Sequence, residues 1–176
     1  MKSLYLPEVP LTVYETAKAA EDKGELYDLL VQPLHEELYR RQDFTFLDDL
    51  SEGQQLIISF DYVQMQVMQG GFIQLIQNGY IGLLPQLPGW LQVFGDHEMA
   101  QVIDDVLKVY VLNREMLDQK TTVEEFAQLY NEFKEFELLD DKFRELKDKT
   151  NDKILQYAIT HIDEFITLVY ENSTLS

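Results

Sequence analysis

The sequence predicts an all-α protein, a single-domain bundle of about seven to nine helices, several of them short. Apolar residues recur at spacings of three and four over most of the chain, and no convincing run has the period of two that marks a strand. Ser51 with Gln54, and Thr122 with Glu125, match capping boxes at helix starts. A chain of 176 residues that is 45% hydrophobic suits one domain, residues 1–176, with a buried core.

Two helices are predicted before the first capping box. Thr12 is expected to cap a helix that runs to about Lys23, and Gly24 would end it. A second helical region covers residues 25–41. Pro33 should break or kink this region, because proline cannot donate the interior backbone hydrogen bond.

The central helix is predicted from Ser51 to about Gln69, where Gly70–Gly71 ends it. Its apolar stripe has spacings of three and four, at Leu56, Phe60, Val63 and Val67. A short helix over residues 72–77 follows, and Asn78–Gly79 suits its left-handed C-cap. Residues 80–95 are rich in Gly and Pro, which predicts a central loop with one short helix after Pro88.

Four helices are predicted after this loop. Asp96 is expected to cap an amphipathic helix whose apolar face runs from Met99 to Val111. The Thr122 capping box starts the next helix. Asp140 is expected to start a short helix, and Asn151 to cap a last helix whose wide apolar stripe reaches Val169.

Acidity is the outstanding compositional feature. The chain has 32 acidic and 14 basic residues, for a formal net charge of −18, and it has no cysteine. Such a charge repels nucleic acid and anionic membranes and attracts basic partners. The lack of cysteine excludes disulfides, thiolate nucleophiles and cysteine-ligated metals. The N-terminal pattern is not that of a secretory signal and no window predicts a membrane span, so we expect a cytoplasmic protein.

Charge is distributed unevenly along the chain. Residues 62–95 contain no charged side chain but seven glutamines. We expect this segment to form the buried centre of the fold, and the alternative is a neutral interface.

Acidic residues elsewhere often occur as adjacent pairs, and pairs near a predicted helix start are favoured by the helix dipole. Three pairs within predicted helices have no such explanation, so we expect them to form a partner-binding surface. These pairs are Glu36–Glu37, Asp104–Asp105 and Asp163–Glu164.

The motifs of common catalytic chemistries are missing from the sequence. The three histidines, His35, His97 and His161, lack metal-ligand spacing, and there is no nucleophile elbow, P-loop or dinucleotide fingerprint. We therefore expect no metal, no cofactor and no enzymatic activity. We single out one acid, Asp61, because it lies on a helical row with Ile57, Met65 and Met68, and a buried position there would require a hydrogen-bond partner.

Residues 67–78, VMQGGFIQLIQN, resemble the Gly-Gly-Phe-x-Gln…Asn core of the bacterial DNA-mimic protein 19 family. The resemblance extends over residues 51–111 as a core on which the helices of residues 122–171 would pack. It departs from the family at Gln69, where the family usually has Asn. From the residue types, we interpret the motif as structural: Gly70 and Gly71 for a tight turn, Phe72 for core packing, and Gln74 and Asn78 for hydrogen bonds to buried backbone.

The resemblance implies an all-helical, often dimeric, bacterial protein that mimics DNA and regulates transcription by occupying the DNA-binding surface of a basic partner. The acidic composition fits this hypothesis, with no direct contact to nucleic acid or membrane. One alternative is an immunity-type or regulatory inhibitor of a specific toxin or enzyme. Another is a small enzyme or ligand-binding protein that uses Asp61, or a pocket in residues 62–95 with Gln74, Asn78 and Trp90.

Overall fold

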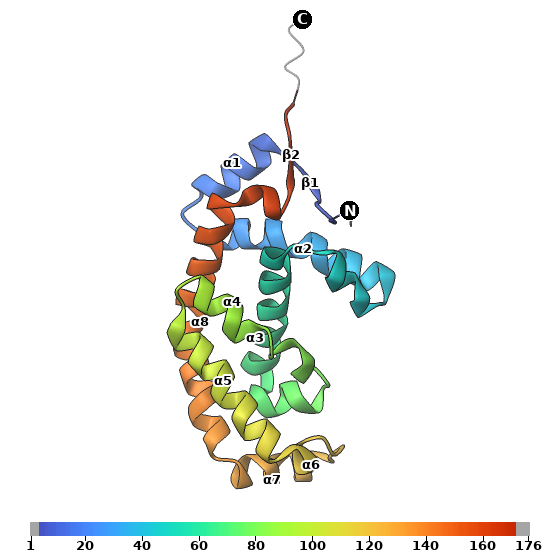
Figure 1. Ribbon diagram of the computed structural model, residues 1–176, viewed down its shortest axis with the longest axis vertical. Coiled ribbons are helices and arrows are strands. Elements are labelled where there is room, and N and C mark those ends of the chain that lie inside the picture. Colours follow the sequence, from blue (N-terminus) through green and yellow to red (C-terminus); the bar gives the residue numbers. More distant parts are fainter. Residues whose placement is uncertain (1–3, 172–176) are drawn as a thin grey trace, which may run out of the picture. The chain divides into compact units, whose positions relative to one another are not determined.

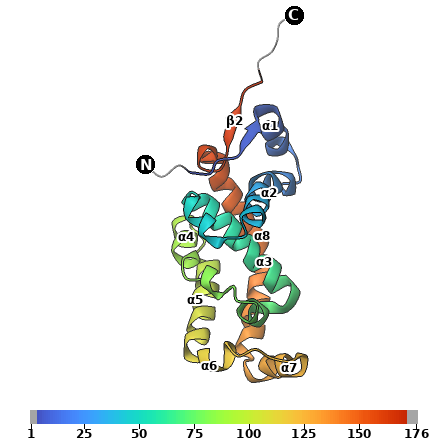
Figure 2. The same cartoon turned by 90° about the vertical axis from the view of Figure 1, so that its right-hand side faces the viewer.

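A computed structural model describes residues 4–171, and it confirms the all-α prediction (Figures 1 and 2). The described residues contain eight α-helices: α1 (Leu11–Ala19), α2 (Gly24–Arg41), α3 (Glu52–Gln77), α4 (Leu87–Val93), α5 (His97–Leu112), α6 (Arg114–Leu117), α7 (Val123–Glu132) and α8 (Glu135–Thr160). They also contain three short 3-10 helices, η1 (Phe44–Asp49), η2 (Ile81–Leu83) and η3 (Ile162–Glu164), and two strands, β1 (Glu8–Pro10) and β2 (Thr167–Val169).

The chain divides into two compact units. The described residues up to Ile58, together with those from Ile154 onward, form the first unit, and Ser59–Lys153 form the second. No helix of the described residues is long and apolar enough to cross a membrane.

The first helices of unit 1 differ from the prediction at their ends. Pro10, not Thr12, precedes the first turn of α1, and α1 ends at Ala19 instead of Lys23. Lys23 explains the early end, because its ammonium donates hydrogen bonds to the carbonyl oxygens of Lys18 and Ala20 at 2.6 and 2.8 Å. Gly24 begins α2 and does not close α1: its N–H donates to the Asp22 carboxylate at 2.8 Å.

The predicted break at Pro33 is wrong, because α2 runs through this residue to Arg41. Leu30, Val31 and Leu34, on both sides of the proline, are almost fully buried. Packing of this apolar face stabilises the helix by more than the missing backbone hydrogen bond costs.

Two short parallel strands were not predicted. In β1 and β2, Val9 is paired with Leu168, and the last helix ends at Thr160 instead of reaching Val169 (Figure 1). Phe165 and Ile166 are buried before β2 begins. The apolar stripe predicted for the last helix therefore combines a helix and a turn that bury apolar residues in unit 1 with a strand, β2, whose residues are exposed or half-buried.

The Ser51–Gln54 capping box is confirmed, and Gln54 does more than cap α3. Its side chain accepts a hydrogen bond from the Ser51 N–H at 3.0 Å and donates to the carbonyl oxygens of Tyr5 and Phe165 at 2.8 and 2.9 Å. Gln54 is fully buried, and its amide satisfies backbone groups from three separate segments of unit 1. These bonds fix the N-terminal segment and the segment after α8 to the start of α3.

The predicted end of the central helix is confirmed as a break inside α3. Gly70 and Gly71 have non-helical backbone angles, and Gly71 is at φ 76° and ψ −176°, a region that is nearly exclusive to glycine. Helical structure resumes at Phe72 and ends before Gly79, at φ 83°. The predicted apolar stripe of α3 is fully buried, at Leu56, Phe60, Val63 and Val67.

The segment after α3 largely follows the prediction. One short helix, α4, contains Pro88 in its first turn, and Asp96 caps α5 by accepting a hydrogen bond from the Met99 N–H at 3.2 Å. The buried face of α5 ends earlier than predicted, because Val111 is 70% exposed. Asp96 also accepts a 2.6 Å hydrogen bond from the Thr150 hydroxyl, so α5 and α8 are joined within unit 2.

The Thr122–Glu125 capping box of α7 is confirmed, but the two helices predicted after it are one helix. Asp140 does not start a helix, and Asn151 does not cap one, since both lie inside α8. Their side chains bond to α3 instead of to nearby backbone: Asp140 accepts from the Phe72 N–H at 2.8 Å, and Asn151 exchanges two hydrogen bonds with Gln64. Because these two side chains form hydrogen bonds with α3, they are not available to cap a helix end.

We predict that Gly71→Ala destabilises the protein by about 2–4 kcal/mol. A Cβ atom at this position would collide with the Asp140 carboxylate and the Tyr130 hydroxyl, and the backbone conformation excludes L-residues. Urea denaturation followed by circular dichroism measures the loss of stability.

Gly79→Ala is the matched control. Gly79 also has a positive φ, but no atom lies within 4 Å of an added Cβ, so only the backbone strain of about 1 kcal/mol applies. Equal losses for the two variants would contradict a packing role for Gly71.

Candidate functional site

The break at Gly70–Gly71 interrupts the hydrogen-bond ladder of α3, and three side chains pair with the released backbone groups. Asp140 of α8 accepts a hydrogen bond from the Phe72 N–H at 2.8 Å. The Tyr130 hydroxyl of α7 donates to the Gly70 carbonyl oxygen. Arg144 of α8 donates to the Val67 carbonyl oxygen at 3.3 Å. The motif is therefore the point at which α3, α7 and α8 meet in unit 2.

The carboxyl group of Asp140 has an altered acidity. Burial raises the pKa of Asp140 to about 6, although the Phe72 N–H and the Arg144 guanidinium act in the opposite direction. Burial also raises the pKa of Tyr130, and the neighbouring Asp140 carboxylate adds to this shift. A cavity of about 390 Å³ opens beside these two residues and Gly70. The sequence assigned Gly70 and Gly71 to the turn but predicted Asp140 only as a helix start and gave Tyr130 no role, because both residues reach the break only in the fold.

The other motif residues have mixed outcomes. Phe72 is fully buried and packs edge-on against Phe143 with ring centroids 5.5 Å apart, which confirms its predicted packing role. Gln74 and Asn78 do not bond to buried backbone as predicted. Both amides donate instead to the Gln66 side chain, at 3.2 and 2.8 Å. They belong to a cluster of uncharged polar side chains near the surface.

The predicted pocket in residues 62–95 is found in part. A groove of about 620 Å³ is lined by Gln74 and Asn78, together with Gln77 and residues around the start of α7, but Trp90 does not line it. The segment is neither wholly core nor wholly surface: Phe72 is fully buried, whereas Met65 and Met68 are about half exposed.

The three acidic pairs predicted to bind a partner lie in different units. Glu36–Glu37 on α2 and Asp163–Glu164 on η3 belong to unit 1, whereas Asp104–Asp105 on α5 belongs to unit 2. Each pair includes at least one carboxylate that bonds within its own unit.

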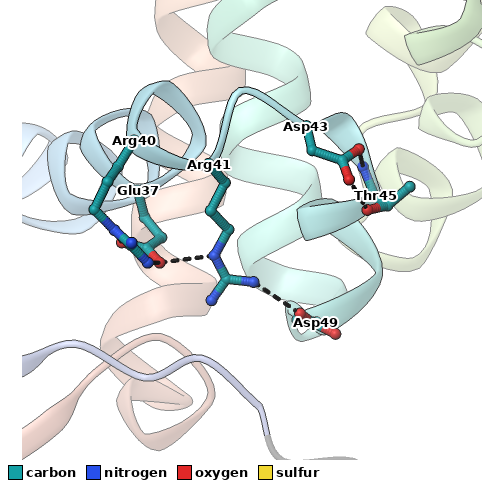
Figure 3. A network of polar contacts seen from close by, with 6 residues as sticks. All are labelled: Glu37, Arg40, Arg41, Asp43, Thr45 and Asp49. Atoms are coloured by element: carbon teal, nitrogen blue, oxygen red, sulfur yellow. Dashed lines mark hydrogen bonds and ion pairs between the residues drawn. The ribbon is translucent and has the colours of Figure 1, made fainter.

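Glu37 is held by two arginines (Figure 3). Its carboxylate accepts hydrogen bonds from Arg40 and Arg41, at 2.5 Å and 2.7 Å for the shortest contacts, and only 11% of its side chain is exposed. Arg41 also bonds to Asp49 at 3.0 Å and lies over the Phe46 ring. The two arginines lower the pKa of Glu37 to about 2. The helix dipole gives no reason for an acidic residue at this position in α2. The contacts with the two arginines do, because they let Glu37 stabilise unit 1.

The other two pairs are less enclosed. Asp104 and Asp105 both form ion pairs with Lys108, at 2.9 and 3.5 Å, and their side chains remain 48% and 41% exposed. Glu164 accepts hydrogen bonds from the Tyr157 hydroxyl, and burial together with this contact raises the pKa of Tyr157 to about 12. Asp163 is exposed beside it, in a 3-10 turn and not in the predicted helix.

A further row of acids becomes visible because α8 is continuous. Five exposed acids follow one another at intervals of four, four, three and four residues: Glu137, Asp141, Glu145, Asp148 and Asp152. At 100° per residue they lie within an arc of about 80°, and they extend about 22 Å along the helix. We call these five residues the α8 acidic row. The spacing was present in the sequence, but the helix boundaries predicted at Asp140 and Asn151 divided it.

Two members of the α8 acidic row have basic neighbours. Arg144 lies 3.3 Å from Asp141, and Lys147 lies 2.6 Å from Asp148. Both carboxylates nevertheless remain 75% and 83% exposed. Exposed pairs of this kind are weak, so the row stays accessible to a basic partner.

Of the residues considered for metal binding or catalysis, His97 lines a groove of unit 2 together with Glu145 of this row. His97 is the first residue of α5, and His161 stacks on Tyr157 with ring centroids 4.2 Å apart. Asp61 is half-buried, not enclosed. Within residues 4–171, no group of three or more His, Asp or Glu side chains is arranged to hold a metal ion.

The family model described as DMP19-like protein matches residues 48–161, more than half of the chain, and this range includes the Gly70–Gly71 break, Asp140 and the α8 acidic row. A search of curated proteins found no significant match.

Asp140 leads to a prediction of pH dependence. Its folded-state pKa of about 6 exceeds the usual 3.8, so the folded state binds this proton more tightly than the unfolded state. The contribution of Asp140 to stability is greatest below pH 4 and decreases as the pH rises through 6, by roughly 3 kcal/mol in total. Asp140→Asn should remove this dependence, because its amide oxygen still accepts the Phe72 N–H but does not titrate.

The measurement is the free energy of unfolding in urea at several pH values between 4 and 8. Asp148→Asn is the control, because Asp148 lies on the same helix but is mostly exposed. An unchanged slope in Asp140→Asn would contradict the assignment.

Proposed function

We propose, because the chain belongs to the DMP19-like protein family, that it is a non-enzymatic DNA mimic. In this proposal it occupies the DNA-binding surface of a basic protein in the bacterial cytoplasm and thereby regulates transcription. Its net charge of −18 supports attraction to such a partner and opposes direct binding to nucleic acid.

The observation that carries this proposal is the α8 acidic row. Its five carboxylates are all exposed and lie along one face of a single helix. The mean spacing is about 5.6 Å along the helix axis. One strand of B-DNA presents a phosphate about every 3.4 Å along its axis, so the row offers somewhat more than half of that linear charge density.

A rigid helix also orders these charges before a partner arrives. Arg and Lys side chains that contact successive phosphates on DNA could pair with successive carboxylates on α8 without ordering a flexible segment first. The acids of the row that have basic neighbours would exchange one weak exposed pair for another. Long-range attraction should make association fast and sensitive to salt.

The test neutralises four of the five acids of the row, all except Glu145, without changing side-chain shape. We expect E137Q/D141N/D148N/D152N to lose DNA-binding proteins that the wild-type protein captures from lysate of cells that express it. The captured proteins should also be released by duplex DNA and by raised ionic strength. Mass spectrometry of the bound fraction, and then affinity measurements with the purified partner, provide the readout.

The control variant, E15Q/E21Q/E25Q/D28N, removes the same charge from exposed positions on and beside α1 and α2. It should retain the partner. A partner that binds duplex DNA and this protein simultaneously would refute mimicry, as would full retention by the row variant. Capture of a single toxin or enzyme that does not bind DNA would instead favour an inhibitor.

A further inference from the structure

Beside the α8 acidic row, unit 2 contains a groove between α5 and α8. These helices run antiparallel there (Figures 1 and 2), and the groove between them has a volume of about 440 Å³. Its side chains combine two chemistries. Val102 and Leu146 provide an apolar surface, and Glu98, Asp105 and Glu145 provide carboxylates from both helices.

We propose that this groove receives one arginine side chain of the basic partner and so anchors the complex. This inference rests on the proposed function, and it names the chemical group that the partner must present. Arginine has a three-carbon stem and a planar guanidinium with five N–H donors. The stem would lie against Val102 and Leu146, and the guanidinium would reach the carboxylates at the edge.

Charge complementarity selects this occupant. Three carboxylates line the groove against one lysine, Lys142, and one of the three, Asp105, also forms an exposed ion pair with Lys108 at 3.5 Å. Another cation of the chain already occupies its edge, because the ammonium of Lys149 on α8 lies 3.1 Å from the Glu98 carboxylate on α5. Both side chains of that ion pair are more than half exposed, so a partner's guanidinium can replace this weak pair.

The groove also offers a site where a bound side chain loses water, which the α8 acidic row does not. Carboxylates on a convex helix surface stay hydrated, and their pairs contribute little affinity. A side chain inserted between two helices loses water, which strengthens its interaction with the carboxylates around it. Glu145 belongs both to the row and to the groove. The row would attract and orient the partner, and the groove would slow its dissociation.

The probe is a 12-residue alanine-based peptide with blocked ends and one central arginine. It is compared with the same peptide carrying lysine, or the neutral isostere citrulline, at that position. Titration is followed by the amide chemical shifts of the full-length protein. The arginine peptide should cause saturable shifts at Glu98, Val102, Asp105 and Leu146, and the citrulline peptide should bind about tenfold more weakly.

The variant E98Q/D105N/E145Q should abolish these shifts while its thermal melting stays unchanged, because all three side chains are at least partly exposed. The matched control, E115Q/E124Q/E132Q, removes three exposed acids of the same unit that do not line the groove and should bind the arginine peptide normally. Equal binding of the arginine and citrulline peptides would overturn the groove proposal. So would unchanged shifts in the groove variant.

The outcome can be separated from that of the proposed function. If the α8 row variant loses the DNA-binding partner but the arginine peptide shows no saturable binding, the groove inference fails and mimicry stands. If the arginine peptide binds in the groove but no DNA-competable partner is captured, the groove site stands and mimicry fails.

Discussion

Unit 2 depends on one constraint: the backbone groups released where α3 breaks must find hydrogen-bond partners. A buried N–H or carbonyl without a partner costs on the order of 1–3 kcal/mol. Phe72 contributes an N–H at the start of a new helical segment, and Asp140 meets it with a carboxylate, the group that a helix N-terminus favours. Tyr130 and Arg144 satisfy two carbonyl oxygens in the same way. Positions in α7 and α8 are thus determined by a break in α3.

The same principle operates in unit 1 through a neutral group. Gln54 lies at the start of α3, and its buried amide pairs with backbone from the segment before β1 and the segment before β2. Ser51 adds a hydrogen bond from its hydroxyl to the Glu164 carbonyl oxygen at 2.6 Å. In both units a residue of α3, or a partner of α3, joins chain segments that are far apart in sequence.

The hydrogen bonds that join these segments come from amides and a few buried side chains, so most of the acidic residues remain at the surface. Glu37 and Glu164 show that some acids are used for local stability, through two arginines and a tyrosine. The α8 acidic row has only weak exposed pairs. Negative charge that does not stabilise the fold opposes it slightly through self-repulsion, and it is available for a basic partner. The row and the neighbouring α5–α8 groove therefore offer complementary means of binding, one by charge at long range and one by contact.

The sequence alone determined the features that depend on local spacing. Both capping boxes, the stripe of α3, the break at Gly70–Gly71 and the burial of Phe72 were predictable, because each requires only near neighbours and backbone preference. Tertiary structure decided the rest. Asp140 and Asn151 resemble helix ends, yet they lie inside α8 because their side chains bond to α3. Residues 167–169 continue a helical pattern, yet they form β2 because they pair with β1. The α8 acidic row and the groove exist because α8 is continuous. The sequence did not predict this continuity, since it depends on hydrogen bonds from Asp140 and Asn151 to residues of α3 that are distant in sequence.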